Sequence, residues 1–63
     1  MSIVGKQFIL LPDKLGEIPY KVVGFKVSGG ELSYYVKFID CIDDMELSSG
    51  DTKAMVMDSV HLG

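Results

Sequence analysis

The stretch that decides the fold is residues 20–40, YKVVGFKVSGGELSYYVKFID. Two runs rich in Val, Phe and Tyr flank the Gly29-Gly30 pair, and paired glycines between such runs are typical of a two-residue β-turn. The stretch therefore predicts a β-hairpin in which Ser28 lies opposite Glu31.

This register predicts one apolar face and one mixed face on the hairpin. A slip by a single residue would exchange the two faces, so the pattern specifies its own register. The mixed face pairs Lys26 with Ser33, Gly24 with Tyr35, Val22 with Lys37 and Tyr20 with Ile39. On the apolar face, we expect seven side chains to share one dry interior: Val23, Phe25, Val27, Leu32, Tyr34, Val36 and Phe38.

Shorter signals place the remaining elements. Residues 6–11, KQFILL, read as a first strand that ends at Pro12, because proline removes a donor from the strand ladder. Residues 12–19 have the composition of a long loop. Residues 48–51, SSGD, predict a turn, residues 52–57 a fourth strand, and residues 60–62 a last short strand after a single 3₁₀ turn. No window has apolar residues at helical spacing over three turns, which disfavours a helix.

This order of elements resembles the SH3-like small barrels, a superfold that includes the SH3, Tudor and KOW-type domains. The resemblance rests on strand order and length and extends over residues 6–62. It implies an all-β, five-stranded SH3-like barrel with a short 3₁₀ turn before the last strand. It also implies binding through loops at one barrel end or through an exposed strand edge.

Size and composition limit the possible classes. A chain of 63 residues predicts one domain, residues 1–63, and its 48% hydrophobic content excludes a disordered chain. One Cys and one His cannot form an internal disulfide or a structural zinc site, so no cofactor is expected. No apolar run reaches the length of about 20 residues that spans a bilayer, and residues 1–7 lack signal-peptide character, which favours a cytoplasmic protein.

Charge is distributed unevenly along the chain. Residues 1–38 contain five lysines and three carboxylates, whereas residues 39–63 contain one lysine and six carboxylates. The chain has no Arg and a net charge of −3, and both features disfavour nucleic-acid binding. The acidic residues have three interpretations: a divalent-cation site, a patch that steers a basic partner, or a solvated loop. They are Asp40, Asp43, Asp44, Glu46 and Asp51.

Aromatic and methionine side chains are the other candidate contacts. Tyr20 and Tyr35 are expected to point outward, where they would contact a partner or, as in Tudor-like domains, form a cage for a methylated ammonium. Met55 and Met57 alternate with Ala54 and Val56 in the predicted fourth strand, where they belong either to the core or to an exposed stripe. The second reading predicts a homodimer formed through this strand.

Cys41 and His61 are the obvious nucleophile and base, but the sequence supplies no orienting group for them. We therefore expect no enzymatic activity, and we expect Cys41 to lie half-buried as a small apolar residue. The leading hypothesis is a small acidic protein-binding module, an adaptor, subunit or inhibitor of the kind that phages and mobile elements encode. Its predicted partner-binding residues are Tyr20, Tyr35, Asp40, Asp43, Asp44, Glu46, Met55 and Met57.

The alternative hypothesis is a Tudor- or KOW-like barrel that recognises a modified side chain or a nucleic acid. Its contacts would be Tyr20, Tyr35 and the hairpin lysines Lys21, Lys26 and Lys37. The lysines would then form a local basic strip in spite of the net negative charge, and binding would fall steeply with salt.

Overall fold

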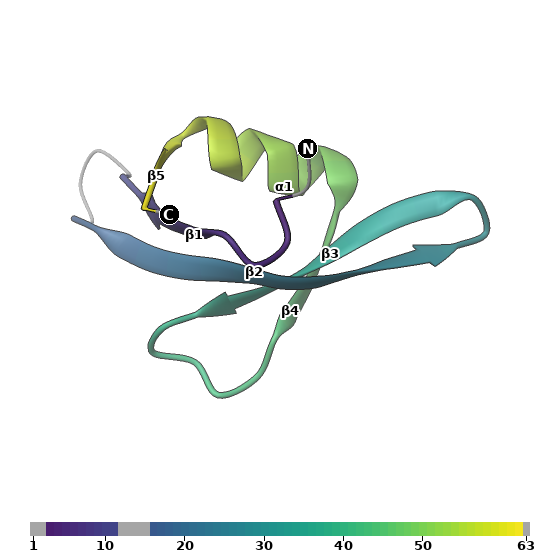
Figure 1. Cartoon of the computed structure of the whole chain (residues 1–63), viewed down its shortest axis with the longest axis horizontal. Coiled ribbons are helices and arrows are strands. Elements are labelled where there is room, and N and C mark those ends of the chain that lie inside the picture. The colour runs from purple at the N-terminus through teal and green to yellow at the C-terminus, as the bar shows by residue number, and fades with distance from the viewer. Residues whose placement is uncertain (1–2, 12–15, 63) are drawn as a thin grey trace.

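The computed structural model is a single antiparallel sheet of five strands with one helix against one of its faces (Figure 1). The structure describes residues 3–11 and 16–62. The sheet order is β4-β3-β2-β1-β5, so no described pairing joins the two edges. The described residues are therefore mostly β, with one helix in a fold predicted to be all-β, and their strands form an open sheet that does not confirm the predicted barrel. The elements are β1 (Gln7–Leu10), β2 (Ile18–Ser28), β3 (Glu31–Phe38), β4 (Met45–Ser48), α1 (Ser49–Met57) and β5 (Ser59–His61).

The hairpin of β2 and β3 forms as the sequence predicts at its turn. Gly29 and Gly30 have φ values of 57° and 80°, the left-handed values that a tight hairpin turn requires and that glycine adopts without strain. Ser28 lies opposite Glu31, and Phe25 lies opposite Tyr34. The predicted register is therefore confirmed for the turn half of the hairpin.

A β-bulge between Val22 and Gly24 changes the register of the other half. The bulge inserts Val23 as an extra residue, so that Val22, and not Val23, lies opposite Val36. The predicted pairs of Val23 with Val36 and of Lys21 with Phe38 are wrong. Val22 and Tyr20 move to the apolar face and become buried, whereas Val23 is exposed. The irregularity falls beside Gly24, and a glycine within a strand often marks a bulge.

Helix α1 replaces the predicted fourth strand at residues 52–57, and the predicted turn at residues 48–51 is its start. The Ser48 side chain accepts a hydrogen bond from the Asp51 backbone N–H at 3.1 Å, which caps the first turn. Thr52, Met55 and Val56 recur at intervals of three and four residues and face the sheet. A helix of nine residues is too short to show the three-turn periodicity on which the sequence prediction relied.

The hydrophobic core lies between α1 and the sheet. Phe8, Tyr20, Val22 and Val36 are its buried apolar residues, and the helix contributes Met55, Val56 and the fully buried Thr52. The rings of Phe8 and Tyr20 stack with centroids 5.4 Å apart. The part-buried residues around this cluster are Ile3, Val4, Leu10, Tyr34, Phe38 and Leu47.

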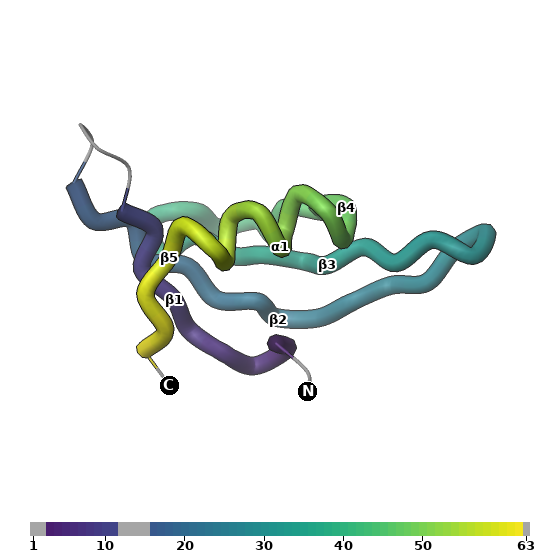
Figure 2. The backbone as a smooth tube through the Cα atoms, turned by 90° about the horizontal axis from the view of Figure 1, so that it is seen from above, coloured from purple at the N-terminus to yellow at the C-terminus, as the bar shows by residue number. Residues whose placement is uncertain are grey.

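The turn half of the hairpin extends beyond the helix, as Figure 2 shows. We call residues 25–34 the hairpin arm. Phe25 and Val27 lie on the core side of the sheet by register, yet they are 60% and 65% exposed, because α1 packs against β1, β3, β4 and β5 and does not reach these two residues of β2. The prediction that both residues share one dry interior is wrong. The arm therefore carries exposed apolar side chains.

Candidate functional site

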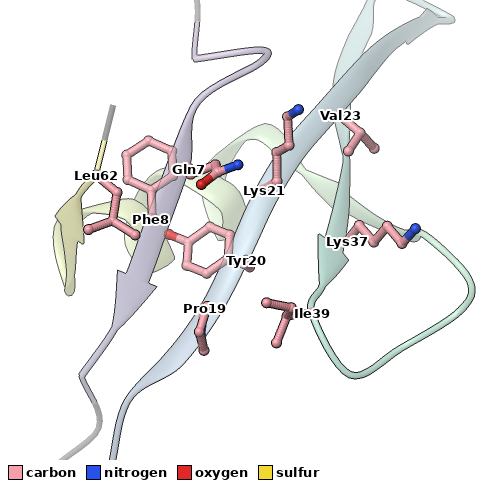
Figure 3. A pocket seen from close by; sticks show the side chains of 9 residues that line it. All are labelled: Gln7, Phe8, Pro19, Tyr20, Lys21, Val23, Lys37, Ile39 and Leu62. Carbon is pink, nitrogen blue, oxygen red and sulfur yellow. The ribbon is translucent and has the colours of Figure 1, made fainter.

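The sheet face that points away from α1 has no helix or strand of the described chain packed against it, and we call it the open face (Figure 1). It contains a shallow pocket of about 260 Å³ over β1, β2 and β3 (Figure 3). Strand pairing explains which side chains reach it, because Gln7, Lys21 and Lys37 lie directly opposite one another on adjacent strands. The lining residues are Gln7, Phe8, Pro19, Tyr20, Lys21, Val23, Lys37, Ile39 and Leu62.

Two lysines occupy the pocket wall as a cross-strand pair. Lys21 and Lys37 are directly opposed in the register, so both ammonium groups emerge on the same face of neighbouring strands (Figure 3). Like charges in this position destabilise a sheet unless a counter-charge lies between them. Within residues 3–11 and 16–62, neither lysine forms an ion pair or a side-chain hydrogen bond. The pocket therefore presents two unneutralised positive charges.

Apolar side chains surround this lysine pair. Ile39 is 71% exposed at the end of β3, and Leu62 and Val23 are exposed on either side. A sheet with one solvated face ordinarily alternates apolar and polar residues, so that the solvated face is polar. Here the solvated face keeps aliphatic side chains beside the positive charges. Such a surface suits a ligand that is both anionic and apolar.

The sequence missed this pocket because its residues come together only after the bulge. In the predicted register, Lys21 lay opposite Phe38 and Lys37 opposite Val22, on different faces. The available signal was Gly24, since a glycine within a strand pattern marks candidate bulge positions. A register shift at that glycine would have placed Lys21 opposite Lys37.

Three of the five predicted acidic residues lie in the loop that follows the pocket, whereas Glu46 lies in β4 and Asp51 in α1. Residues 39–44 form the connection between β3 and β4, which we call the acidic loop, and Asp40, Asp43 and Asp44 are all exposed in it. The apolar residue Ile42 is 93% exposed among them. Cys41 is also exposed, so the prediction of a half-buried cysteine is wrong. The physical reason is that the loop extends from the ends of β3 and β4 on the side away from α1, so the helix does not cover it (Figure 1).

Tyr20 lies in the core, and its predicted outward position is wrong. Its side chain is only 3% exposed, and its hydroxyl lies 2.7 Å from Ser59 Oγ. Ser59 Oγ donates its one proton to the Met55 carbonyl at 2.6 Å, so the Tyr20 O–H donates to Ser59. This chain of hydrogen bonds ties the C-terminal end of α1 to β2. Burial raises the pKa of the Tyr20 hydroxyl above its ordinary value of 10.0, against a smaller lowering by the Ser59 contact.

Tyr35 and Glu46 are cross-strand partners on the open face. The Tyr35 ring lies close to Gly24, its predicted cross-strand partner, since a Cβ built on that glycine would be 3.7 Å from Tyr35 Cδ2. Glu46 Oε1 pairs with Lys26 Nζ at 3.4 Å. Because Tyr20 and Tyr35 lie on opposite faces of the sheet, they do not form the aromatic cage that the alternative hypothesis needs.

The two methionines lie on the helix side, away from the open face. Met55 is half-buried against the core, whereas Met57 is exposed at the end of α1. A homodimer formed through a strand of Met55 and Met57 is therefore excluded in that form, because these residues belong to a helix. The predicted partner-binding set thus divides between a core residue, the two faces of the sheet and the acidic loop.

The described residues contain no group of three or more His, Cys, Asp and Glu side chains placed to hold a metal ion. His61 packs its ring against Phe8, with centroids 5.2 Å apart, at the β5 edge of the sheet. Cys41 lies in the acidic loop that follows β3. In the described part of the chain, no helix has the length and apolar character needed to cross a membrane.

Comparison with known proteins gives no relative from which a function could be transferred: no family model, curated protein or solved structure matches the chain.

Proposed function

We propose that this protein is a small binding module without enzymatic activity, and that its open face binds an acidic segment with aliphatic side chains on a partner protein. The observation that carries the proposal is the Lys21–Lys37 pair, which is directly opposed across two strands and has no counter-charge among the described residues. In this role the protein would act as an adaptor, a subunit or an inhibitor.

A carboxylate between the two ammonium groups would remove their mutual repulsion and accept charge-assisted hydrogen bonds from both. Ile39, Leu62 and Val23 would cover the aliphatic side chains that flank such a carboxylate. Burial of these exposed apolar atoms supplies affinity, and the charges supply orientation and association rate. The partner segment thus needs both features.

The acidic loop lies beside this basic pocket, so the surface carries both signs of charge within a short distance. Asp40, Asp43 and Asp44 would repel a long polyanion while leaving a single acidic segment free to bind. The acidic residues beside the pocket favour a protein partner over a nucleic acid, although Lys21, Lys26 and Lys37 share the open face. Met57 lies on the helix side and is outside the proposed contact.

A relation to the SH3-like barrels is also a proposal. It is supported by the strand order β4-β3-β2-β1-β5 and by the single helix that precedes the last strand. An experimental structure in which β4 approaches β5 closely enough to pair would support it, and a flat open sheet would contradict it.

The binding proposal is tested by following backbone amide NMR shifts during titration with three probes. They are the peptide acetyl-LELEL-amide, its uncharged counterpart acetyl-LQLQL-amide and an oligothymidylate. We expect the acidic peptide to shift the amides of Gln7, Lys21, Lys37 and Ile39, and the Gln peptide to bind about tenfold more weakly. The double variant Lys21→Ala/Lys37→Ala should lose a similar factor.

Lys53→Ala is the matched control, because Lys53 is an exposed lysine on α1, away from the pocket. This variant should bind the acidic peptide like the wild type. Shifts that do not distinguish the two peptides would overturn the proposal. Binding of the oligothymidylate alone, with a steep loss on addition of salt, would support the nucleic-acid alternative instead.

A further inference from the structure

The acidic loop has the same chemistry that the open face is proposed to bind. Its sequence, IDCIDD in residues 39–44, combines two exposed aliphatic side chains with three carboxylates. Ile42 is almost fully exposed, and Asp43 and Asp44 follow it directly. Within the described residues, none of the three loop carboxylates has an ion pair or a hydrogen bond. The loop and the pocket are therefore complementary surfaces that one chain carries side by side.

The distance between loop and pocket is too short for the loop to fold back onto its own pocket. Ile39 is both a lining residue of the pocket and the first residue of the loop, and a turn bonded from Cys41 N–H to Phe38 O fixes the start of the loop at the end of β3. A second copy related by a two-fold axis near Ile39 faces no such restriction. Each copy could then place its loop in the pocket of the other, and such a reciprocal contact is closed.

We propose that a second copy of this chain occupies the open face, with the acidic loop of each copy seated between Lys21 and Lys37 of the other. The inference rests on the proposed function, because the dimer would cover the surface that binds a partner segment. Self-association would then regulate that surface: the open face is masked at high protein concentration and free at low concentration.

Charge reversal tests this arrangement, with particle mass measured by sedimentation velocity. At low salt, the wild type should change from the chain mass of 6.9 kDa to twice that mass between about 10 µM and about 1 mM. The pocket variant Lys21→Glu/Lys37→Glu and the loop variant Asp40→Lys/Asp43→Lys/Asp44→Lys should each stay monomeric. Lys53→Glu, on the helix side, should dimerise like the wild type.

An equimolar mixture of the pocket and loop variants provides the sharpest outcome. In a mixed pair, the acidic loop of one chain meets the lysines of the other, and the lysine loop meets the new glutamates. Both contacts are restored, so we expect a heterodimer from two chains that are separately monomeric. A mixture that stays monomeric, or a wild type that stays at 6.9 kDa at about 1 mM, would overturn the proposal.

Further measurements distinguish this dimer from a folding defect, from a dimer formed through the hairpin arms and from a monomeric binding module. If charge reversal impairs folding, Ile42→Ser removes the apolar loop tip without a change of charge, and the dimer should weaken at least tenfold. A dimer that survives both charge reversals but is lost in Phe25→Asp would join the hairpin arms, which contradicts the proposal. Acidic-peptide binding that depends on the lysines in a monomeric wild type would leave the proposed function standing and remove only the dimer.

Discussion

The body of the sheet and the hairpin arm are made from the same two strands but differ in what covers them. In the body, Val22 and Val36 lie opposite each other and have no exposed surface. In the arm, Phe25 lies opposite Tyr34 on the same side of the sheet, yet most of the Phe25 ring is in solvent. Alternation decides which side chains share a face, whereas burial depends on how far α1 reaches.

The largest difference between the two regions should appear when the same substitution is made in each. Phe8→Ala removes a buried ring that stacks on Tyr20, and we expect a loss of about 3–5 kcal/mol in the free energy of unfolding. Phe25→Ala removes an exposed ring of the arm and should cost less than about 1 kcal/mol. Urea unfolding followed by far-UV circular dichroism measures both.

Because the loss expected for Phe8→Ala is comparable to the whole free energy of unfolding of so small a domain, Phe8→Leu serves as the milder variant. It should unfold cooperatively with a loss of about 1–1.5 kcal/mol. Equal losses for Phe8→Ala and Phe25→Ala at low protein concentration would contradict the comparison, since the arm would then belong to the cooperative core.

A smaller effect should follow from loosening the helix that covers the body. Ser48→Ala removes the hydrogen bond to the Asp51 N–H, and we expect a loss of about 1 kcal/mol in the free energy of unfolding. Ser28→Ala is the matched control in the arm, where the structure shows no side-chain bond for this exposed serine, and it should change stability by less than about 0.5 kcal/mol. Equal losses of stability for Ser48→Ala and Ser28→Ala would show that the Ser48 cap does not stabilise α1 on the sheet.

The smallest effect concerns the attachment of α1 to β2. Tyr20→Phe removes the hydroxyl that donates to Ser59, and at neutral pH we expect a loss of about 0.5–1.5 kcal/mol. Because burial raises the pKa of Tyr20 in the folded state, the neutral phenol is favoured there. Its contribution is present below the unfolded value of 10.0 and is lost as the pH rises through the folded value.

Urea unfolding of the wild type and Tyr20→Phe between about pH 7 and about pH 11 measures this dependence. The wild type should lose more stability than Tyr20→Phe at the alkaline end. Only the wild type has a buried phenol at position 20, and that phenol ionises more readily in the unfolded chain than in the folded one. Tyr35→Phe, on the open face, controls for the loss of a tyrosine hydroxyl. Parallel pH profiles for the wild type and Tyr20→Phe would rule out the buried phenol as the cause.

Local patterns in the sequence predicted the hairpin and the two terminal strands, but they missed β4 and placed the fourth strand where α1 lies. The tight turn, the pairing from Phe25 to Tyr34, the first strand and the short last strand all follow from glycine and β-branched residues. The helix was missed because its apolar signal consists only of Thr52, Met55 and Val56. Serine and aspartate, the residue types at positions 48 and 51, are frequent both in turns and at the start of helices. Only the residues that follow them distinguish the two structures.

The candidate site was predicted in part. The acidic loop and the position of Tyr35 on the open face follow from local composition and alternation. The pocket does not, because one inserted residue at Val23 decides whether Lys21 lies opposite Phe38 or Lys37. Burial of Val22 and Tyr20 in the core between α1 and the sheet favours this register over the regular one.

The sequence by itself determined that this chain would form a glycine-turned hairpin with an acidic connection after it, because turns and alternation depend on neighbouring residues. Tertiary structure alone decided which half of the hairpin is buried, that residues 49–57 form a helix, and that two lysines lie opposite each other on an open surface. The physical reason is that a bulge and a covering helix act between segments distant in sequence, where burial of apolar area outweighs local preference.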